Sequence, residues 1–123
     1  MPPPSPLAIA TSSVQRLIKE ESMYHKELVE QQARVTKLEQ DIANKNPDLD
    51  ENAEYILKQE KQAMDETKAV FQPLHKRIAE AVAKLEEQVA LSESGADEGS
   101  AEQLAKAKET LTQGQEALKA AEE

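Results

Sequence analysis

Two residues of this 123-residue chain have the type and spacing of metal ligands. Glu21 and His25 are four residues apart, so a helix would place both side chains on one face, where they would offer a metal ion two ligands. Two ligands without a third are a weak signal, and the chain has no cysteine that could add a thiolate. We therefore expect no metal site, and the lack of cysteine also excludes a disulfide framework.

The motifs of catalytic sites are missing from the sequence. There is no Gly-rich phosphate loop and no nucleophile elbow, and the chain has only two histidines. Carboxylates are abundant, but a catalytic carboxylate needs a partly buried pocket that shifts its pKa, and a thin helical rod offers no pocket of useful depth. We therefore expect a protein that is not an enzyme and requires no cofactor.

The composition limits the other classes of function. A net charge of −9, with 38% hydrophobic and 2% aromatic residues, lies close to intrinsic disorder, so the periodicity of the sequence has to decide whether the chain folds. The net acidity argues against generic nucleic-acid binding, which needs cations to neutralise phosphates. No apolar run approaches the ~20 residues that span a bilayer, and the start "MPPPSPLAIA" lacks the features of a secretory signal. We expect no membrane association and a cytoplasmic location.

The first predicted helix covers about residues 12–43. Ser12 is a suitable N-cap with Gln15 three residues on, the spacing of a capping box. Two mainly apolar positions then repeat every seven residues, which predicts one stripe along the helix. The first position holds Val14, Glu21, Leu28, Val35 and Ile42, and the second holds Leu17, Tyr24, Gln31 and Leu38. Residues 1–11, which begin with "MPPPSP", are predicted to be a disordered tail.

The second predicted helix covers about residues 52–91 and contains Pro73. It follows a turn, "NKNPDLDEN", in which Asp48 or Asp50 could cap the helix. Its stripe passes through Pro73 without a change of phase, so we predict one helix that is kinked there, at a cost of about 3 kcal/mol for the proline. The stripe consists of Leu57, Met64, Phe71, Ile78 and Leu85, widened before the proline by Ile56, Ala63 and Val70 and after it by Leu74, Ala81, Val82 and Val89.

The third predicted helix covers about residues 100–121, after a loop at 92–100. Ser100 and Gln103 repeat the capping-box spacing, and Leu104, Leu111 and Leu118 recur every seven residues. Small residues at the companion positions, among them Gly114, would let this helix lie close to its neighbours. Short loops favour antiparallel neighbours. We therefore predict an all-α protein, an elongated antiparallel three-helix bundle of coiled-coil type that forms a single domain over residues 12–123.

Two stretches of the sequence resemble the tubulin-binding cofactor A family of tubulin-folding chaperones. The stretch "RLIKEESMYHKELVEQQARVTKLEQD" (16–41) is similar to the first helix of the family, and "YILKQEKQAMDETKAVFQPLHKRI" (55–78) to its second helix, including a proline that matches Pro73. The residues of the first stretch that fit the pattern of the family are Arg16, Leu17, Lys19, Glu20, Tyr24, Glu27 and Gln32.

The resemblance implies a specific function. It implies a three-helix rod that binds β-tubulin monomers stoichiometrically, without catalysis, and holds them in a near-native state before αβ-tubulin assembly. β-Tubulin would be the partner, other tubulin-folding cofactors are further candidates, and the location would be cytoplasmic and associated with the cytoskeleton. Both a monomer and a homodimer remain open.

The expected contact face combines residues that fit the family with residues that interrupt the pattern. Met23 and Val29 are apolar but lie off the stripe, and Val70 lies beside the predicted kink. The residues of the expected face are Arg16, Lys19, Glu20, Met23, Tyr24, Glu27, Val29, Val70 and Pro73. Two other functions stay open: a coiled-coil scaffold or oligomerisation domain whose stripe is shared between chains, and a regulatory three-helix domain of a membrane-fusion protein, which would continue into a fusion helix and an anchor.

Overall fold

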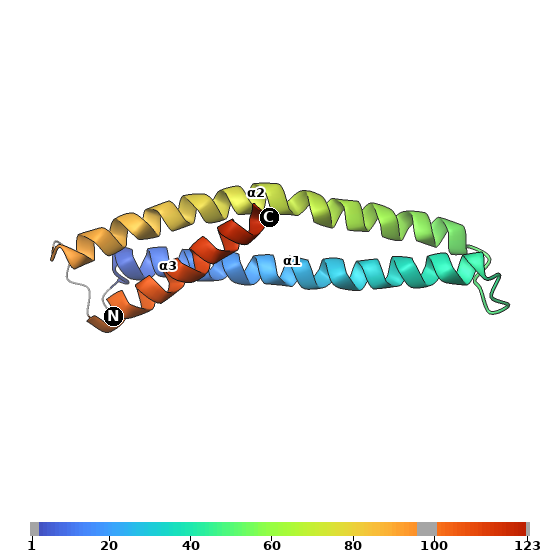
Figure 1. Ribbon diagram of the computed structural model, residues 1–123, viewed down its shortest axis with the longest axis horizontal. Coiled ribbons are helices and arrows are strands. Elements are labelled where there is room, and N and C mark those ends of the chain that lie inside the picture. The colour runs from blue at the N-terminus through green and yellow to red at the C-terminus, as the bar shows by residue number, and fades with distance from the viewer. Residues whose placement is uncertain (1–2, 96–100, 123) are drawn as a thin grey trace. The chain divides into compact units, whose positions relative to one another are not determined.

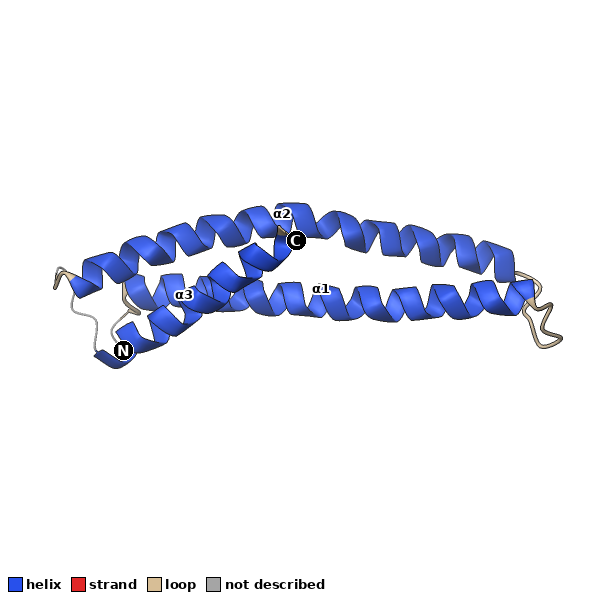
Figure 2. Ribbon diagram, viewed as in Figure 1, coloured by secondary structure: helices blue, strands red, loops and turns tan. Residues whose placement is uncertain are grey.

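The computed structural model describes residues 3–95 and 101–122, and within these ranges the chain forms three α-helices and no strand (Figures 1 and 2). The helices are α1 (Pro6–Ala43), α2 (Ala53–Glu93) and α3 (Ala101–Ala121). The all-α class is thus confirmed. None of the helices in the described ranges is long and apolar enough to cross a membrane. The predicted cap of the third helix, Ser100, lies outside the described residues.

The start of α1 differs from the prediction. The helix begins at Pro6 rather than at Ser12, so the prediction of a disordered tail is wrong for residues 6–11. Ser5 is the N-cap: its Oγ accepts a hydrogen bond from the backbone N–H of Ala8 (3.1 Å), and its carbonyl oxygen accepts one from Ile9 (3.0 Å). Proline suits the first helical position because the missing N–H would have no partner there. The additional turn buries Leu7 completely and extends the seven-residue repeat towards the N-terminus.

Two compact units make up the chain. The first unit consists of Met1–Glu21 and Gln72–Glu123, and the second consists of Ser22–Phe71. The first unit therefore contains the beginning of α1, the end of α2 and the whole of α3, whereas the second contains only parts of α1 and α2. The formation of a single domain over residues 12–123 stays a prediction.

In the first unit, α3 lies beside the beginning of α1 and the end of α2 (Figure 1). Gln15 donates a hydrogen bond to the hydroxyl of Thr110 (3.2 Å), and Lys108 forms an ion pair with Glu93 (3.1 Å). Beneath these polar contacts the three segments share one hydrophobic core. Its completely buried aliphatic side chains are Leu7, Val14, Leu74, Ile78 and Leu85, and Val82 and Val89 are almost as deeply buried.

Close packing of α3 depends on small residues, as the sequence predicts. Its buried residues are Ala107, Thr110 and Gly114, whereas its three leucines are half-buried at the edges of the contact. A Cβ added at Gly114 would lie 2.7 Å from Cγ2 of Val82 and 3.1 Å from Cγ1 of Val14. Both valines are stiff at χ1, so neither side chain can easily move aside. Glycine at this position is therefore a requirement of packing, which outweighs its poor helix propensity.

Pro73 lies inside α2, which continues through it to Glu93. This confirms the prediction of one helix rather than two. The kink itself stays a prediction. Of the side chains that widen the stripe after the proline, Leu74, Val82 and Val89 are buried in the first unit and Ala81 is half-buried. Val82 packs against Gly114 of α3.

In the second unit, α1 and α2 form an antiparallel hairpin. Tyr24 contacts Phe71, and Arg34 contacts Glu60, so residue numbers rise along one helix as they fall along the other. Asp50 Oδ1 accepts a hydrogen bond from the backbone N–H of Asn52 (2.8 Å), which stabilises the turn that leads into α2.

The position of the N-cap can be tested with two serine variants. We expect Ser5→Ala to lower the free energy of unfolding by about 1 kcal/mol, because the first turn of α1 loses its cap. Ser12→Ala should cause no loss, because Ser12 lies within the helix and alanine favours helix formation. Urea unfolding followed by circular dichroism measures both. An equal loss in the two variants would show that Ser5 does not cap the helix.

The close approach of α3 leads to a second prediction. We expect Gly114→Ala to destabilise the protein by about 1–2 kcal/mol, because a steric cost of up to about 3 kcal/mol exceeds the gain of about 1 kcal/mol in helix propensity. Adding Val82→Ala should reduce the effect of Gly114→Ala in a double-mutant cycle. The exposed Gln113→Ala is the control and should be neutral. Greater stability of Gly114→Ala in thermal unfolding would contradict the packing described here.

Candidate functional site

The two residues with the spacing of metal ligands have other contacts. In the first unit, Glu21 is buried and its Oε2 lies 2.5 Å from Nε2 of His75, so the two groups form an ion pair when the imidazole is protonated. In the second unit, the ring of His25 stacks on Phe71 with centroids 4.5 Å apart. Among the described residues, no group of three or more His, Cys, Asp or Glu side chains is arranged to hold a metal ion.

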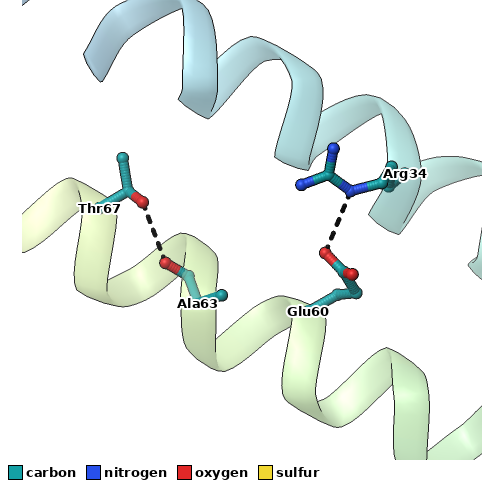
Figure 3. A network of polar contacts seen from close by, with 4 residues as sticks. All are labelled: Arg34, Glu60, Ala63 and Thr67. Atoms are coloured by element: carbon teal, nitrogen blue, oxygen red, sulfur yellow. Dashed lines mark hydrogen bonds and ion pairs between the residues drawn. The ribbon is translucent and has the colours of Figure 1, made fainter. Parts of the chain in front are cut away.

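The hairpin of the second unit has a thin core with polar residues in it. Its buried apolar residues are Val35, Ala53 and Met64. Gln31 and Thr67 are also buried, with 4% and 6% of their surface exposed. Thr67 donates a hydrogen bond to the carbonyl of Ala63 (3.1 Å; Figure 3), whereas Oε1 of Gln31 has no hydrogen-bond partner among the described residues. A buried acceptor without a partner is unfavourable, which makes Gln31 the most unusual residue of this unit.

One flank of this hairpin is lined mainly by apolar side chains. The register of the two helices follows from the ion pair between Nε of Arg34 and Oε2 of Glu60 (3.3 Å), which crosses from α1 to α2 (Figure 3). The same register places three residues of α1 opposite three of α2. We call these six residues the open flank: Tyr24, Gln31 and Leu38 of α1 opposite Val70, Ala63 and Ile56 of α2.

A shallow groove marks one end of the open flank. Its apolar residues are Leu38 and Ile56, and Ile56 is 37% exposed. Four charged residues border these two: Arg34, Lys37, Asp41 and Glu60. An apolar centre with a charged border is the usual composition of a surface that binds another protein.

The other flank of the same hairpin is polar. The corresponding positions hold Gln32 and Glu39 on α1 and Lys61 and Lys68 on α2, and Lys61 pairs with Glu39 (3.4 Å). In the first unit a third helix covers one flank of the pair, whereas among the described residues of the second unit no third helix covers either flank. The open flank is therefore the candidate binding surface.

The structure brings four of the nine predicted contact residues to the open flank. Tyr24 and Val70 belong to it, and Met23 and Glu27 lie beside it on α1. Met23 is 63% exposed, and Val29 is 69% exposed on the other side of the helix. The other predicted residues belong to the first unit, where Arg16, Lys19 and Pro73 are exposed and Glu20 is half-buried.

The sequence alone does not indicate a binding role for Gln31, Leu38, Ile56 or Ala63. A signal for the α2 residues is nevertheless present in the sequence: Ile56, Ala63 and Val70 recur every seven residues, directly before the main stripe. Such a second apolar row widens a helical stripe beyond what one partner helix covers. The role of Gln31 has no comparable signal, because polar residues in a stripe also occur where they only set the register.

Together, the helices and the open flank are those of an all-α protein with a candidate binding surface. The family model described as Tubulin binding cofactor A matches residues 2–111, and the chain belongs to this family. A relative from Saccharomyces cerevisiae named Tubulin-specific chaperone A is 36% identical over 84 residues, which are 68% of this chain and 72% of the relative. No solved structure matches the chain.

The unpartnered amide of Gln31 leads to a prediction about stability. We expect Gln31→Leu to raise the free energy of unfolding by about 1 kcal/mol or more, because an apolar side chain of similar size removes a buried acceptor without a partner. Gln32→Leu is the matched control, since Gln32 is exposed on the polar flank and should give no such gain. Urea unfolding of both variants provides the comparison, and a less stable Gln31→Leu variant would mean that the amide has a stabilising partner.

Proposed function

We propose that this protein is a tubulin-folding chaperone that binds β-tubulin monomers stoichiometrically and holds them in a near-native state before αβ-tubulin assembly. The observation that carries the proposal is membership of the tubulin binding cofactor A family, together with a yeast relative that is named as a tubulin-specific chaperone. The open flank supports it as a surface on which a protein could bind. Other tubulin-folding cofactors are further candidate partners.

The physical basis of such a function is binding without catalysis. A chaperone that binds only the folded or near-folded form of a client stabilises that form by mass action. It also covers apolar client surface that would otherwise favour aggregation. The half-exposed apolar side chains of the open flank suit this role, and the net charge of −9 opposes self-association of the chaperone.

The proposed contact surface retains the nine predicted residues as candidates and gives them an order. Met23, Tyr24, Glu27 and Val70 come first, because they lie on or beside the open flank. The residues of the first unit follow, namely Arg16, Lys19, Glu20 and Pro73. Val29 comes last, because it lies on the other side of α1.

The proposal is tested by native size-exclusion chromatography of the purified protein mixed with dissociating tubulin, with each fraction blotted for α- and β-tubulin. We expect the protein to comigrate with β-tubulin and not with α-tubulin. If neither subunit comigrates under conditions in which a known β-tubulin binder succeeds, the proposed function is wrong.

Two exposed apolar residues on α1 provide a matched pair of variants for the same assay. We expect Met23→Glu to weaken β-tubulin binding about tenfold, because a charge replaces an apolar side chain beside the open flank. Val29→Glu introduces the same charge at an equally exposed position and should bind as the wild type does. Circular dichroism verifies that both variants fold. Equal binding by the two variants would remove Met23 from the contact surface.

The open flank also favours one alternative, a coiled-coil scaffold in which a second copy of the chain occupies the flank. Sedimentation velocity distinguishes the two functions. A concentration-dependent oligomer whose helicity falls on dilution indicates the scaffold, whereas a stable species that binds β-tubulin indicates the chaperone.

A further inference from the structure

We propose that the open flank binds one amphipathic α-helix of the client, with Lys or Arg along its border, as a third helix on the second unit. This inference rests on the proposed function, because the client is then β-tubulin. It adds which element of the client binds, where it lies and which charges it carries.

The spacing of the open flank fits a helix. Its residues form two rows, one on each helix, and the members of each row are seven residues apart. Two such rows form a furrow that accepts side chains repeating every three to four residues, as in the packing of one helix against two others. An extended segment repeats every two residues and would leave its backbone N–H and C=O groups without partners against helical side chains. A helix satisfies these groups internally.

The first unit gives an example of this arrangement within the same chain. There, α3 packs on the pair formed by α1 and α2 and approaches closely through Ala107, Thr110 and Gly114. Under this helix the aliphatic side chains are almost completely buried, whereas Leu38 and Val70 on the open flank are only half-buried. A client helix on the open flank would complete their burial.

The charges beside the open flank indicate the charge of the client helix. Glu27 and Glu30 on α1 and Glu66 on α2 are exposed and border the half of the flank that contains Tyr24 and Val70. No Lys or Arg occupies the bordering positions of this half, which are residues 23, 27 and 30 of α1 and residue 66 of α2. At the other end, Arg34 is paired with Glu60 across the flank. Electrostatic complementarity therefore favours a helix with basic residues over the acidic half.

Gln31 lies beneath the middle of the flank and is polar. Its Oε1 is an acceptor without a partner among the described residues, and only 4% of the surface of the residue is exposed. The oxygen is closed off from the surface, so a donor of the client helix reaches it only if the side chain of Gln31 turns outward.

A site-specific crosslink tests where the client helix lies. The chain has no cysteine, so Ala63→Cys introduces a single thiol on the open flank, which can be labelled with benzophenone maleimide. The control is Lys68→Cys, an exposed position of α2 on the polar flank. After irradiation with β-tubulin, we expect the Ala63→Cys protein to crosslink within one α-helix of β-tubulin that carries Lys or Arg. The Lys68→Cys protein should give several-fold less crosslinked product.

A pair of charge variants tests the complementarity. Glu66→Lys and Asp65→Lys change the net charge equally at neighbouring residues of α2. Successive residues are about 100° apart around the helix, so Glu66 borders the open flank and Asp65 does not. We expect Glu66→Lys to weaken β-tubulin binding about five- to tenfold at low salt, and less at high salt. Asp65→Lys should bind within about twofold of the wild type. Equal effects of the two variants would contradict the proposed charge of the client helix.

The outcomes separate this inference from the proposed function. If β-tubulin binds but the crosslinks lie in a strand or a loop of β-tubulin, or join two copies of this chain, the inference is wrong and the chaperone function stands. If the wild-type protein does not bind β-tubulin in size-exclusion chromatography, both are wrong. Crosslinks within one basic helix, together with weaker binding by Glu66→Lys alone, support the inference.

Discussion

The structure depends on the packing of α1 against α2 along apolar positions that repeat every seven residues. In each unit this contact removes side chains from water and fixes which residues of the two helices face one another. In the second unit, the pair Arg34–Glu60 reflects the resulting register. A shift of one residue would rotate each row of side chains by about 100° around its helix. The register therefore determines the composition of both flanks, including the row of Ile56, Ala63 and Val70 on the open flank.

Polar residues within this contact reduce its stability but make the register more specific. Glu21 is buried beside His75, and burying such a polar group contributes little net stability because the group loses water. Removing His75 would nevertheless be costly, since the carboxyl group of Glu21 would lose this partner while it remains buried. Gln31 adds an acceptor without a partner among the described residues. Aliphatic residues at these positions would favour stability, whereas polar residues favour one alignment of the helices over others.

Much of the helical structure follows from the sequence, because an uninterrupted repeat is a strong signal. The repeat continues in phase through Pro73, and the structure has one helix there. The start of α1 was predicted incorrectly because several prolines in succession suggest an extended tail, whereas a single proline after Ser5 favours helix initiation. The open flank could not be identified in the same way. The sequence shows that α2 has apolar residues beyond one stripe, but which of them α3 covers depends on packing in three dimensions.

The difference between the two units suggests how stability and binding are divided. In the first unit, α3 completes a core of fully buried Leu, Ile and Val side chains, and Gly114 allows this close contact. The hairpin of the second unit buries few apolar residues, and the polar Gln31 is buried beside them. Among the described residues of this unit no third helix covers the open flank, so apolar side chains such as Ile56 remain in water. Each Å² of apolar surface that a partner covers is worth about 25 cal/mol before the costs of association are subtracted. If a client helix covered the open flank, as proposed above, the surface that adds little to the stability of the hairpin would be the one that favours binding.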